Sequence, residues 1–294
     1  MRKTITLFLL GFPLFCLAQK TDTVIRYFNV NLESDTRENA RFVGKAWEDK
    51  GIWTAYVFDA SAKLIMKGQF KDRNLKIKEG RFIFFHENGN VDKIGNYENT
   101  MKTGTWVSYY ENGNLKDSVQ YAENVKRGLA IGWDLNGARR YEGRNESSHP
   151  EGTWTWFHAN GTASTKEEYI KGKLSKLDCY DSTGKLTGHN CSLSTTPTIK
   201  GRYGGIQKYI IDSLVYPKEG LKKGLQGAVS LEFTLSKTGQ PMDFKVISTP
   251  DPLLSDEVIH LIKSVPEWYP AVEHNVPVDY TFKLYVPFVL PETY

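Results

Sequence analysis

Residues 216–290 have the sequence YPKEGLKKGLQGAVSLEFTLSKTGQPMDFKVISTPDPLLSDEVIHLIKSVPEWYPAVEHNVPVDYTFKLYVPFVL. Three segments within this stretch, 228–235, 242–248 and 278–290, alternate apolar and polar residues. Alternation with a period of two predicts strands that bury one face. The stretch therefore predicts three half-buried strands, and the last of them is the longest.

Two helical patterns accompany these strands. One precedes the stretch, and the other lies between the second and third strands. Their apolar positions are, in order, Ile206, Tyr209, Ile210, Leu214, Leu254, Val258, Leu261 and Ile262. Apolar residues three and four positions apart line one face of a helix. The order helix, strand, strand, helix, strand predicts an α+β domain at 205–294, in which a three-stranded antiparallel sheet carries both helices on its apolar face.

This domain resembles the C-terminal domain of TonB, the energy transducer of outer-membrane transport. The resemblance covers residues 204–290. It rests on the strand Gly227–Phe233, on the string Pro266-Glu267-Trp268 and on the closing segment 286–290. The residues that match the family motif are Tyr216, Pro217, Gly227, Gly239, Trp268 and Pro270.

The resemblance implies a mode of binding. In that family an extended segment of an outer-membrane receptor adds to the sheet beside the last strand, which makes the expected partner a protein or peptide. Pro287 lies inside that strand and cannot donate to a ladder, so the strand should be an edge. Alternatively, Pro287 only ends the strand, and a dimer partner or the linker closes the edge. The residues expected at the binding edge are Tyr280, Phe282, Lys283, Leu284, Tyr285, Val286, Pro287 and Phe288.

The part of the chain before this domain is repetitive. Four glycines follow one another at intervals of 24 residues, and an Asn-Gly pair comes eight residues after each of them. The glycines and pairs are Gly80 with Asn88-Gly89, Gly104 with Asn112-Gly113, Gly128 with Asn136-Gly137, and Gly152 with Asn160-Gly161. Degenerate copies on both sides extend the set to about six units. A repeat domain is therefore predicted over 20–190.

Each repeat unit is predicted to be a β-hairpin. Asn-Gly between strand-forming runs favours a type I′ turn, in which both central residues have a positive φ. A single hairpin cannot bury its aromatic side chains, so the units must stack. We expect a core ladder of Phe85, Tyr109, Trp133 and Phe157, with Trp106, Trp154 and Trp156 partly exposed. The third unit departs from the pattern with Ala130 and Arg139, where apolar residues are expected.

The hairpin units resemble the MORN-like repeats of the YwqK antitoxin type. Residues 104–115, GTWVSYYENGNL, match the recurring phrase G-x-W-x-x-Y-Y-x-N-G-x-L. The resemblance covers about 50–190 and implies an antiparallel β-hairpin array. It implies no particular ligand, because such repeats provide binding or spacing surfaces in many settings.

The N-terminus indicates export. Two basic residues, Arg2 and Lys3, precede an apolar run that ends near Ala18. This pattern is typical of a secretory signal peptide, predicted at 1–18, and the run is short for a transmembrane helix. Cleavage leaves 36 basic and 34 acidic residues in scattered positions. This distribution contains no basic patch of the kind that binds nucleic acid. We expect a periplasmic or cell-envelope protein, with association to the outer membrane open.

Two cysteines remain after cleavage, Cys179 and Cys191. In an oxidising compartment thiols at this spacing are candidates for a disulfide, and the alternative of free thiols stays open. No metal site and no cofactor are predicted. Residues 191–204, rich in Ser, Thr, Gly and Lys, are interpreted as a linker between the two domains.

No pattern for catalysis is present. None of the six histidines lies in a metal-binding or nucleophile motif, and no phosphate-binding glycine loop occurs in a suitable context. His86 and His158 share a repeat position with Tyr110 and Asp134, which indicates an exposed strand face. The neighbours Glu167 and Glu168 are interpreted as solvated. We expect a protein that is not an enzyme and has no small-molecule substrate.

The sequence thus predicts an envelope protein that binds extended peptide segments by strand addition, linked by resemblance to TonB-dependent transport; N-terminal segments of outer-membrane receptors are the candidate ligands. One alternative is a structural scaffold that uses its repeats to bind an envelope partner. Another is a membrane-anchored energy transducer that retains residues 1–18. TonB transducers carry an anchor and a long Pro-rich spacer, whereas this chain has a signal-like segment and repeats in their place. Oligomeric state stays open.

Overall fold

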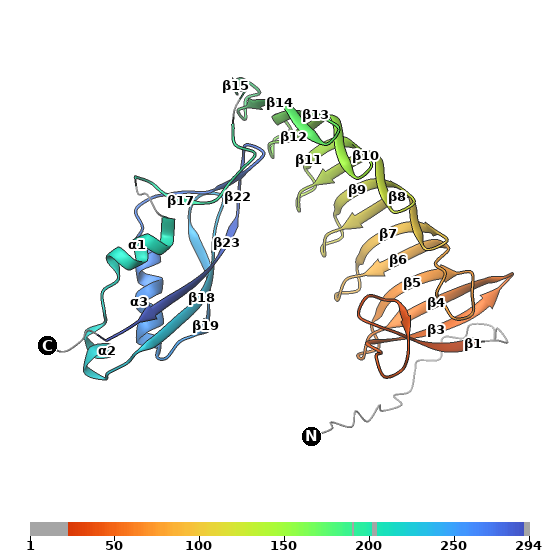
Figure 1. Ribbon diagram of the computed structural model, residues 1–294, viewed down its shortest axis with the longest axis horizontal. Helices are drawn as coiled ribbons and strands as arrows, with labels where there is room; N and C mark the ends of the chain where they lie inside the picture. The colour runs from red at the N-terminus through yellow and green to blue at the C-terminus, as the bar shows by residue number, and fades with distance from the viewer. Residues whose placement is uncertain (1–22, 190, 202–204, 291–294) are drawn as a thin grey trace. The chain divides into compact units, whose positions relative to one another are not determined.

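A computed structural model describes residues 23–189, 191–201 and 205–290, and the predicted signal peptide lies outside them. The chain forms two compact units, Met1–Gly137 with Asn145–Ser148, and Ala138–Arg144 with His149–Tyr294. Both units are mainly β (Figure 1). Of the helices in the described part of the chain, none has the length and hydropathy that a membrane span needs.

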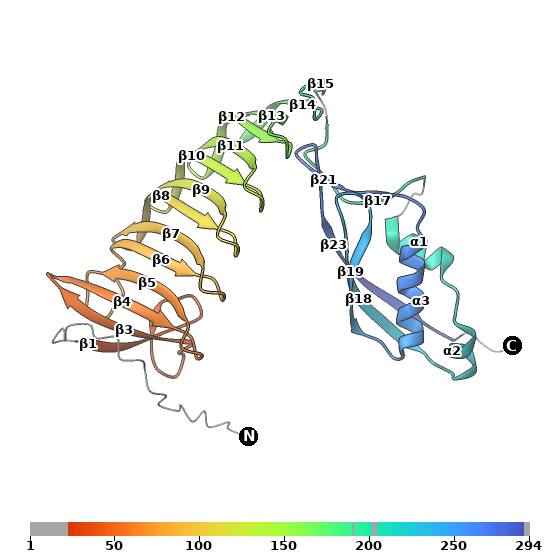
Figure 2. The ribbon, with the colours of Figure 1, turned by 180° about the vertical axis from the view of Figure 1, so that it is seen from behind.

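The repeats form one antiparallel sheet in which neighbours along the chain are neighbours in the sheet, from β3 to β15 (Figures 1 and 2). Only β1 and β2 depart from chain order, because β1 lies between β3 and β2. The strands are β1 Thr23–Phe28, β2 Ser34–Asp35, β3 Phe42–Asp49, β4 Ile52–Phe58, β5 Leu64–Phe70, β6 Gly80–Phe85, β7 Val91–Glu98, β8 Met101–Tyr109, β9 Leu115–Ala122, β10 Val125–Trp133, β11 Arg139–Glu146, β12 His149–Phe157, β13 Ala163–Ile170, β14 Lys173–Tyr180 and β15 Leu186–Gly188. The predicted hairpin array is confirmed.

The predicted turn type at the Asn-Gly pairs is wrong. Only the glycine has a positive φ there, for example 87° at Gly89, and the register shifts by one residue beside each turn where the pairing is defined. This is the pattern of a type I turn followed by a bulge with glycine in the left-handed conformation. The two-residue type I′ turns join successive units instead. They include Asn99-Thr100, Glu123-Asn124, Ser147-Ser148 and Lys171-Gly172, in which both residues have a positive φ.

The asparagine of the Asn-Gly pair connects neighbouring units. Nδ2 of Asn88 donates to the carbonyl oxygen of Glu111 at 2.8 Å, and Nδ2 of Asn112 donates to that of Leu135 at 3.2 Å. Asn160 makes the same bond to Ser182 at 2.8 Å. The asparagine therefore recurs because it satisfies a turn carbonyl of the next unit, in addition to forming its own turn.

The residues six positions after each repeat glycine have a similar role. His86 Nε2 lies 3.0 Å from the carbonyl oxygen of Tyr109, and Tyr110 donates to that of Trp133 at 2.9 Å. His158 repeats the contact with Tyr180 at 3.0 Å. The expectation of an exposed strand face needs correction, because His86, Tyr110 and His158 are half-buried and bind the main chain of the next unit.

The aromatic core follows a different row from the one predicted. Phe82, Phe84 and Trp106 are buried, whereas Phe85, Tyr109, Trp133 and Phe157 are half-buried. Trp106 is only 5% exposed, which corrects its expected partial exposure, while Trp154 and Trp156 are half-buried. Phe82, Tyr97 and Trp106 form a chain of edge-to-face contacts, with ring centroids 4.8 and 5.0 Å apart. The row two positions after the repeat glycine therefore forms the core.

Each large ring in that row lies over a glycine of the preceding strand. A Cβ at Gly95 would come within 2.1 Å of the Trp106 ring, and one at Gly143 within 2.2 Å of Trp154. In the third unit the equivalent positions are Val119 and Ala130, which are directly opposite each other in β9 and β10. In the third unit the strand that elsewhere has the glycine has the larger Val119, and the strand that elsewhere has the large ring has the smaller Ala130. The space between the two strands therefore stays filled.

This exchange yields a prediction. Gly95→Val alone should destabilise the array by about 2 kcal/mol, because the added side chain overpacks the Trp106 ring. Trp106→Ala alone should cost about 3 kcal/mol by leaving a cavity. The double variant copies the third unit, so it should be more stable than Trp106→Ala. Urea unfolding of the three variants checks this, and strictly additive losses would contradict the packing exchange.

The C-terminal domain has the predicted order of elements with additions. Helices α1 Gly205–Ser213 and α3 Pro252–Lys263 and strands β18 Gly227–Leu235, β19 Pro241–Ser248 and β23 Tyr280–Phe288 match the expected helices and strands. The sequence did not reveal helix α2 Lys218–Lys222 or the short strands β16 Ser194–Thr195, β17 Thr198–Ile199, β20 Trp268–Tyr269, β21 Ala271–Glu273 and β22 Val276–Val278. The last strand is shorter than predicted, because Val278 belongs to β22, which pairs with β21.

The core of this domain lies between the sheet and its helices. Val229, Leu231, Phe233 and Leu235 of β18 are all at most 2% exposed. They pack with the apolar sides of α1 and α3 in one cluster that also contains Leu284, Val286 and Phe288 of β23. The opposite face of the sheet carries no helix (Figures 1 and 2).

The described part of the expected linker, 191–201, contains more regular structure than predicted. Strand β16 pairs with β21 and strand β17 pairs with β20. Ile199 is 4% exposed and belongs to the core of the C-terminal domain. Cys179 and Cys191 form a disulfide, with Cα atoms 6.2 Å apart, so this segment is also tied to the last repeat.

Candidate functional site

Strand β23 is an edge of the three-stranded sheet. The order of that sheet is β19-β18-β23, and β23 runs antiparallel to β18. Nine residues, from Tyr280 opposite Leu235 to Phe288 opposite Gly227, pair one to one without a register shift. In an edge strand every second residue directs its N–H and C=O away from the sheet, where another strand can bind them.

The other edge of the same sheet is irregular. The register between β18 and β19 shifts twice, between Ser230 and Leu231 and between Glu232 and Thr234. Asp243, within β19, has a φ of 52°. Bulges of this kind twist an edge strand and prevent continuous pairing with a further strand. Of the two edges, only β23 is regular.

The side chains predicted at the binding edge fall into two sets. Lys283, Tyr285 and Pro287 are exposed on the face without helices, together with Thr281. The remaining five lie toward the core: Leu284, Val286 and Phe288 are buried, and Tyr280 and Phe282 are half-buried. A partner strand would contact the first set through side chains, whereas the side chains of the second set face the core.

The charged residues of the open face next to the edge form one pair across the strands. Nζ of Lys283 lies 3.6 Å from Oε2 of Glu232, on the central strand, and the Lys283 side chain is 83% exposed. Tyr285 is 63% exposed, and it is directly opposite Ser230. The open face next to the edge is therefore polar and aromatic, with little net charge.

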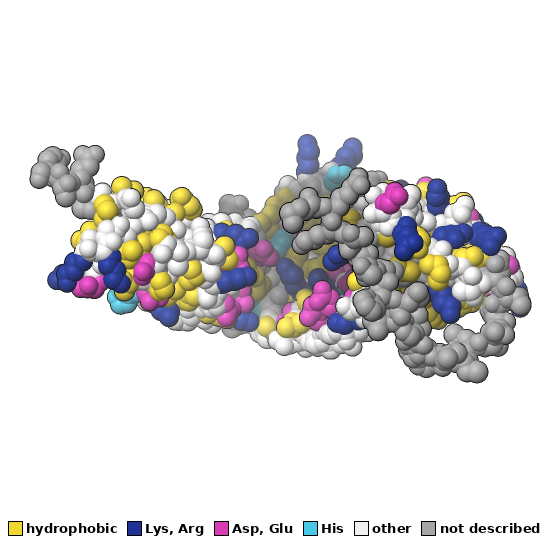
Figure 3. Space-filling model, turned by 90° about the horizontal axis from the view of Figure 1, so that it is seen from below, with side chains coloured by type: hydrophobic (Ala, Val, Ile, Leu, Met, Phe, Trp, Pro, Cys, Tyr) yellow, Lys and Arg dark blue, Asp and Glu magenta, His cyan; other side chains and the backbone are white. Residues whose placement is uncertain are grey.

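Apolar side chains are exposed near the end of β23. Val289, directly after the strand, is 74% exposed, and Val215, directly before Tyr216, is 68% exposed. Figure 3 shows hydrophobic side chains over much of the C-terminal domain on this side. These two valines are apolar side chains that the core of the domain does not cover.

The family-motif residues support β23 from the core side. Trp268 is 6% exposed and lies 5.8 Å from Phe282 and 6.3 Å from Phe233, measured between ring centroids. Gly239 has a φ of 81° and approaches the carbonyl oxygen of Trp268 so closely that a Cβ there would lie 2.9 Å from it. These residues hold the strand in place and are not exposed for binding.

The motif residues at the other end of the domain act on the end of β23. The hydroxyl of Tyr216 donates to the carbonyl oxygen of Leu225, and the Tyr216 ring meets that of Phe288 edge to face at 5.4 Å. Pro217 is the N-cap of α2, and Pro270 separates β20 from β21. A Cβ at Gly227 would lie 2.8 Å from the Pro250 ring. The motif therefore frames the strand without contributing reactive groups.

The structure also contains a buried acidic cluster that the sequence analysis missed. Glu167 of β13 is 1% exposed, which corrects the expectation that it is solvated. Its Oε1 lies 2.6 Å from His274 Nδ1, in the turn between β21 and β22, and accepts from Thr165 at 2.8 Å. Its Oε2 accepts from Tyr169 at 2.8 Å. The His274 ring stacks on that of Trp156 with centroids 3.4 Å apart.

These contacts set the charge state of the cluster. Burial alone would raise the pKa of Glu167, but the hydrogen bonds from His274, Thr165 and Tyr169 outweigh burial and lower that pKa. The pKa of Tyr169 is raised, first by burial and then by its bond to the Glu167 carboxylate. The cluster is therefore an ionised carboxylate within a complete set of donors. Asn275 adds a bond to the carbonyl oxygen of Tyr180 at 2.9 Å.

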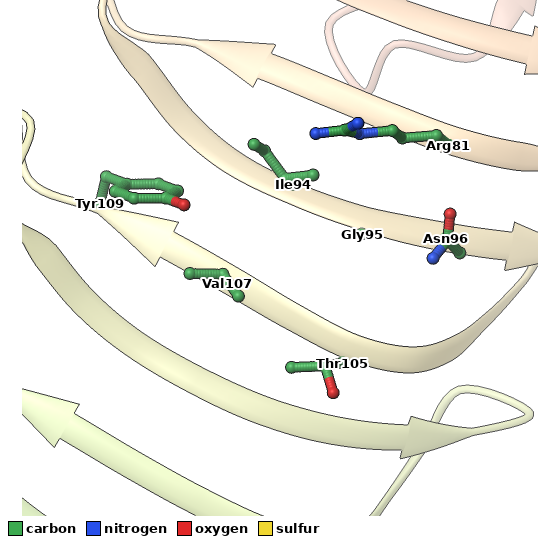
Figure 4. A pocket seen from close by; sticks show the side chains of 7 residues that line it. All are labelled: Arg81, Ile94, Gly95, Asn96, Thr105, Val107 and Tyr109. Atoms are coloured by element: carbon green, nitrogen blue, oxygen red, sulfur yellow. The ribbon is translucent and has the colours of Figure 1, made fainter.

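A shallow depression on the repeat sheet lies on the face opposite the Trp106 row (Figure 4). It is lined by Arg81, Ile94, Gly95, Asn96, Thr105, Val107 and Tyr109. These residues include no carboxylate, histidine or cysteine that would serve as an acid, base or nucleophile. The depression offers one guanidinium, and nothing in its lining indicates chemistry.

Comparison with known protein families finds a match in both parts of the chain. Residues 212–290 match the family described as Gram-negative bacterial TonB protein C-terminal. Residues 78–99 and 102–123 match the family described as MORN repeat variant. A search of curated proteins found no match for the chain.

The chain thus combines a TonB-type C-terminal domain with a preceding array of MORN-variant repeats, as the sequence predicted. The TonB-type domain makes this an envelope protein, and domains of this kind take part in protein–protein interactions.

The buried cluster predicts a dependence of stability on pH. Because the pKa of Glu167 is lowered on folding, its contribution is present above the ordinary value of about 4.3 and is lost as pH falls through the folded value. Glu167→Gln should cost about 2 kcal/mol at pH 7 and remove this loss in acid. Unfolding midpoints between pH 7 and pH 3, followed by tryptophan fluorescence, check this.

The neighbouring Glu168→Gln is the matched control. Glu168 is half-buried and accepts one bond from Thr153, so its replacement should leave the acid-dependent loss in place. If Glu167→Gln and the unaltered protein show parallel pH profiles, Glu167 is not ionised in the folded protein.

Proposed function

We propose that this protein is an envelope binding protein whose C-terminal domain captures an extended peptide segment as an additional strand beside β23. The ligands are segments of outer-membrane receptors, and the process served is TonB-dependent transport. The observation that carries the proposal is the regular, nine-residue edge of β23, beside an opposite edge that bulges interrupt.

The geometry accounts for affinity and selectivity separately. Main-chain groups along β23 supply hydrogen bonds to any extended segment, whatever its sequence. Lys283 and Tyr285 would determine which peptide sequences bind, because their exposed side chains would lie beside those of the added strand. Pro287, near the end of the edge, has no N–H, so that end of β23 offers a partner strand fewer main-chain donors.

The proposal involves no chemistry on the ligand. The edge strand and its open face contain a lysine, tyrosine, threonine and proline, with Glu232 beside them. A set of this kind binds and orients a segment, and no acid–base pair or nucleophile with its base is present in it. The role proposed is therefore binding, without catalysis.

Two lysines opposite the same residue allow a matched test. Lys283 of β23 and Lys245 of β19 both pair with Glu232, from opposite sides of the central strand. A proline at either position removes one main-chain donor at the same level of the sheet, but because Glu232 directs its own N–H and C=O to only one neighbour, only one of the two changes removes a ladder bond to β18. Lys283→Pro should weaken binding of receptor N-terminal segments at least tenfold, whereas Lys245→Pro should leave it unchanged. Fluorescence anisotropy with labelled peptides and the full chain measures both.

Two controls separate binding from folding. Lys283→Ala removes the side chain and keeps the donor, so it should change affinity by less than threefold. Thermal unfolding of both proline variants shows whether they lose stability to a similar extent. Equal affinity of the Lys283→Pro and Lys245→Pro variants, or no saturable binding by the unaltered protein, would refute strand addition at β23.

Export is a separate part of the proposal. A basic start, an apolar run and Ala18 support cleavage by signal peptidase. We expect the protein in the envelope fraction to begin at residue 19, as determined by mass spectrometry of the intact protein. A chain that still begins at Met1 would favour a membrane-anchored transducer instead.

A further inference from the structure

Three lysines recur at the same position of successive repeats. Lys78, Lys102 and Lys126 are 24 residues apart, each two residues before the repeat glycine of its unit. Each is directly opposite an aromatic residue of the preceding strand: Lys78 is opposite Phe70, Lys102 opposite Tyr97, and Lys126 opposite Tyr121. We call this set of three the lysine row.

The main chain of each lysine in the row is held at both ends by the next turn. The N–H of Lys102 donates to Oδ1 of Asn124 at 2.7 Å, and its carbonyl oxygen accepts from the Asn124 N–H at 3.0 Å. Thr100 makes the same two bonds to Lys78, and Ser148 makes them to Lys126. The row is therefore preorganised, so that a ligand would order only the lysine side chains.

Two of the three ammonium groups of the row, those of Lys78 and Lys102, lie over aromatic rings. Nζ of Lys102 is 4.5 Å from the centroid of a Trp106 ring and 5.1 Å from that of Tyr121. Nζ of Lys78 is 5.2 Å from that of Tyr97. Such contacts position a cation but leave its charge uncompensated. The row is therefore a line of positive charge in which buried and half-buried aromatic rings position Lys78 and Lys102.

Carboxylates do not neutralise this charge at close range. In the described part of the chain no carboxylate oxygen lies within 4 Å of Nζ of Lys78, Lys102 or Lys126. Lys71 and Arg127, in contrast, are paired, since Lys71 lies 3.4 Å from Glu79 and Arg127 lies 2.9 Å from Glu146.

The pKa shifts agree with this arrangement. Burial lowers the pKa of Lys102, and the like charges of Lys93, Lys126 and Lys78 lower it further. Burial lowers the pKa of Lys78 as well, against the attraction of the Glu33 carboxylate. Lysines that repel one another are stabilised by an anionic ligand that spans them.

The spacing of the row selects the form of such a ligand. The lysines lie two strands apart, so successive charges are about 10 Å apart at the usual strand separation. A peptide in the polyproline II conformation advances about 9 Å in one turn of three residues. Acidic side chains at every third position of such a peptide would lie at nearly the same interval. In a β-strand, by contrast, residues three apart point to opposite faces.

We propose that the lysine row binds an acidic, proline-rich peptide segment in the polyproline II conformation, with one carboxylate beside each lysine. The prolines would lie against the aromatic rings between successive lysines of the row, as proline-rich segments do in aromatic-lined grooves. The site spans three units, because in the fourth unit the lysine is replaced by Pro150 and the turn residue by Gly172. A segment of about nine residues fills it.

The test uses the full chain and two synthetic peptides of equal composition. One repeats Pro-Pro-Glu four times, and the other contains the same residues with the glutamates at intervals of two and four. Binding is measured by isothermal titration calorimetry at low and high salt. We expect the first peptide to bind at least tenfold more tightly than the second and to lose most of its affinity at 0.5 M salt. Equal affinities would overturn the proposal.

Variants locate the binding. Lys102→Gln and Lys126→Gln should each weaken binding of the Pro-Pro-Glu peptide at least fivefold, and Lys102→Arg should retain it. Lys116→Gln is the matched control, because Lys116 also lies over a ring, 5.6 Å from the Tyr110 centroid, but outside the row. Its affinity should be unchanged. Circular dichroism confirms folding, and the exposed Lys126 keeps the test valid if the Lys102 variant misfolds.

Other polyanions test whether the lysine row binds anions of another class instead of an acidic peptide. A sulfated polysaccharide and vesicles with anionic lipid are titrated under the same conditions. If either binds more tightly than the Pro-Pro-Glu peptide and loses affinity on Lys102→Gln, the row binds a polyanion of another class and the peptide proposal is wrong. The result is independent of strand addition, because it does not involve β23.

Discussion

The constraint that organises this protein is the need of strand main chains for hydrogen-bond partners at every sheet edge. Unpaired N–H and C=O groups along an edge invite a further strand, so stable proteins shorten, bend or charge their edges. The repeat sheet ends in β2, with two residues, and in β15, with three. The part of β14 beyond β15 carries Lys173 and Lys176. In the TonB-type domain β19 is bulged. Among the described strands, β23 is thus a long, regular edge in a molecule whose other edges are blunted.

The same constraint explains why the repeats need particular polar residues at their turns. A single-layer sheet has no second layer to fix its loops, so each unit must bond to the next. The Asn-Gly asparagines do this at one end of the hairpins, and Thr100, Asn124 and Ser148 do it at the other. The repeat signature is therefore mainly a hydrogen-bonding pattern, and the glycines over which Trp106 and Trp154 pack provide the space for the core.

Much of the fold followed from local sequence, because alternation, helical spacing and Asn-Gly turns are local signals. The edge position of the last strand was also predictable, since Pro287 excludes a central strand. Other features depend on partners far along the chain. Glu167 reads as a surface carboxylate until His274, 107 residues away, is placed beside it. The turn type at Asn88 depends on a bulge, and the burial of Trp106 depends on Gly95 of the adjacent strand. A single sequence contains these residues but not their register.

The regular edge and the lysine row recognise different properties of a peptide. Strand addition recognises an extended main chain, and its hydrogen bonds are little affected by salt. The lysine row recognises charge at a fixed interval, and ion pairs between partly exposed groups weaken as the Debye length shortens from about 10 Å to about 3 Å. A proline-rich segment is a poor strand because it lacks donors, and a β-strand places its acidic residues at the wrong interval for the row. The two surfaces therefore select mutually exclusive conformations, so one peptide segment cannot occupy both in the same form.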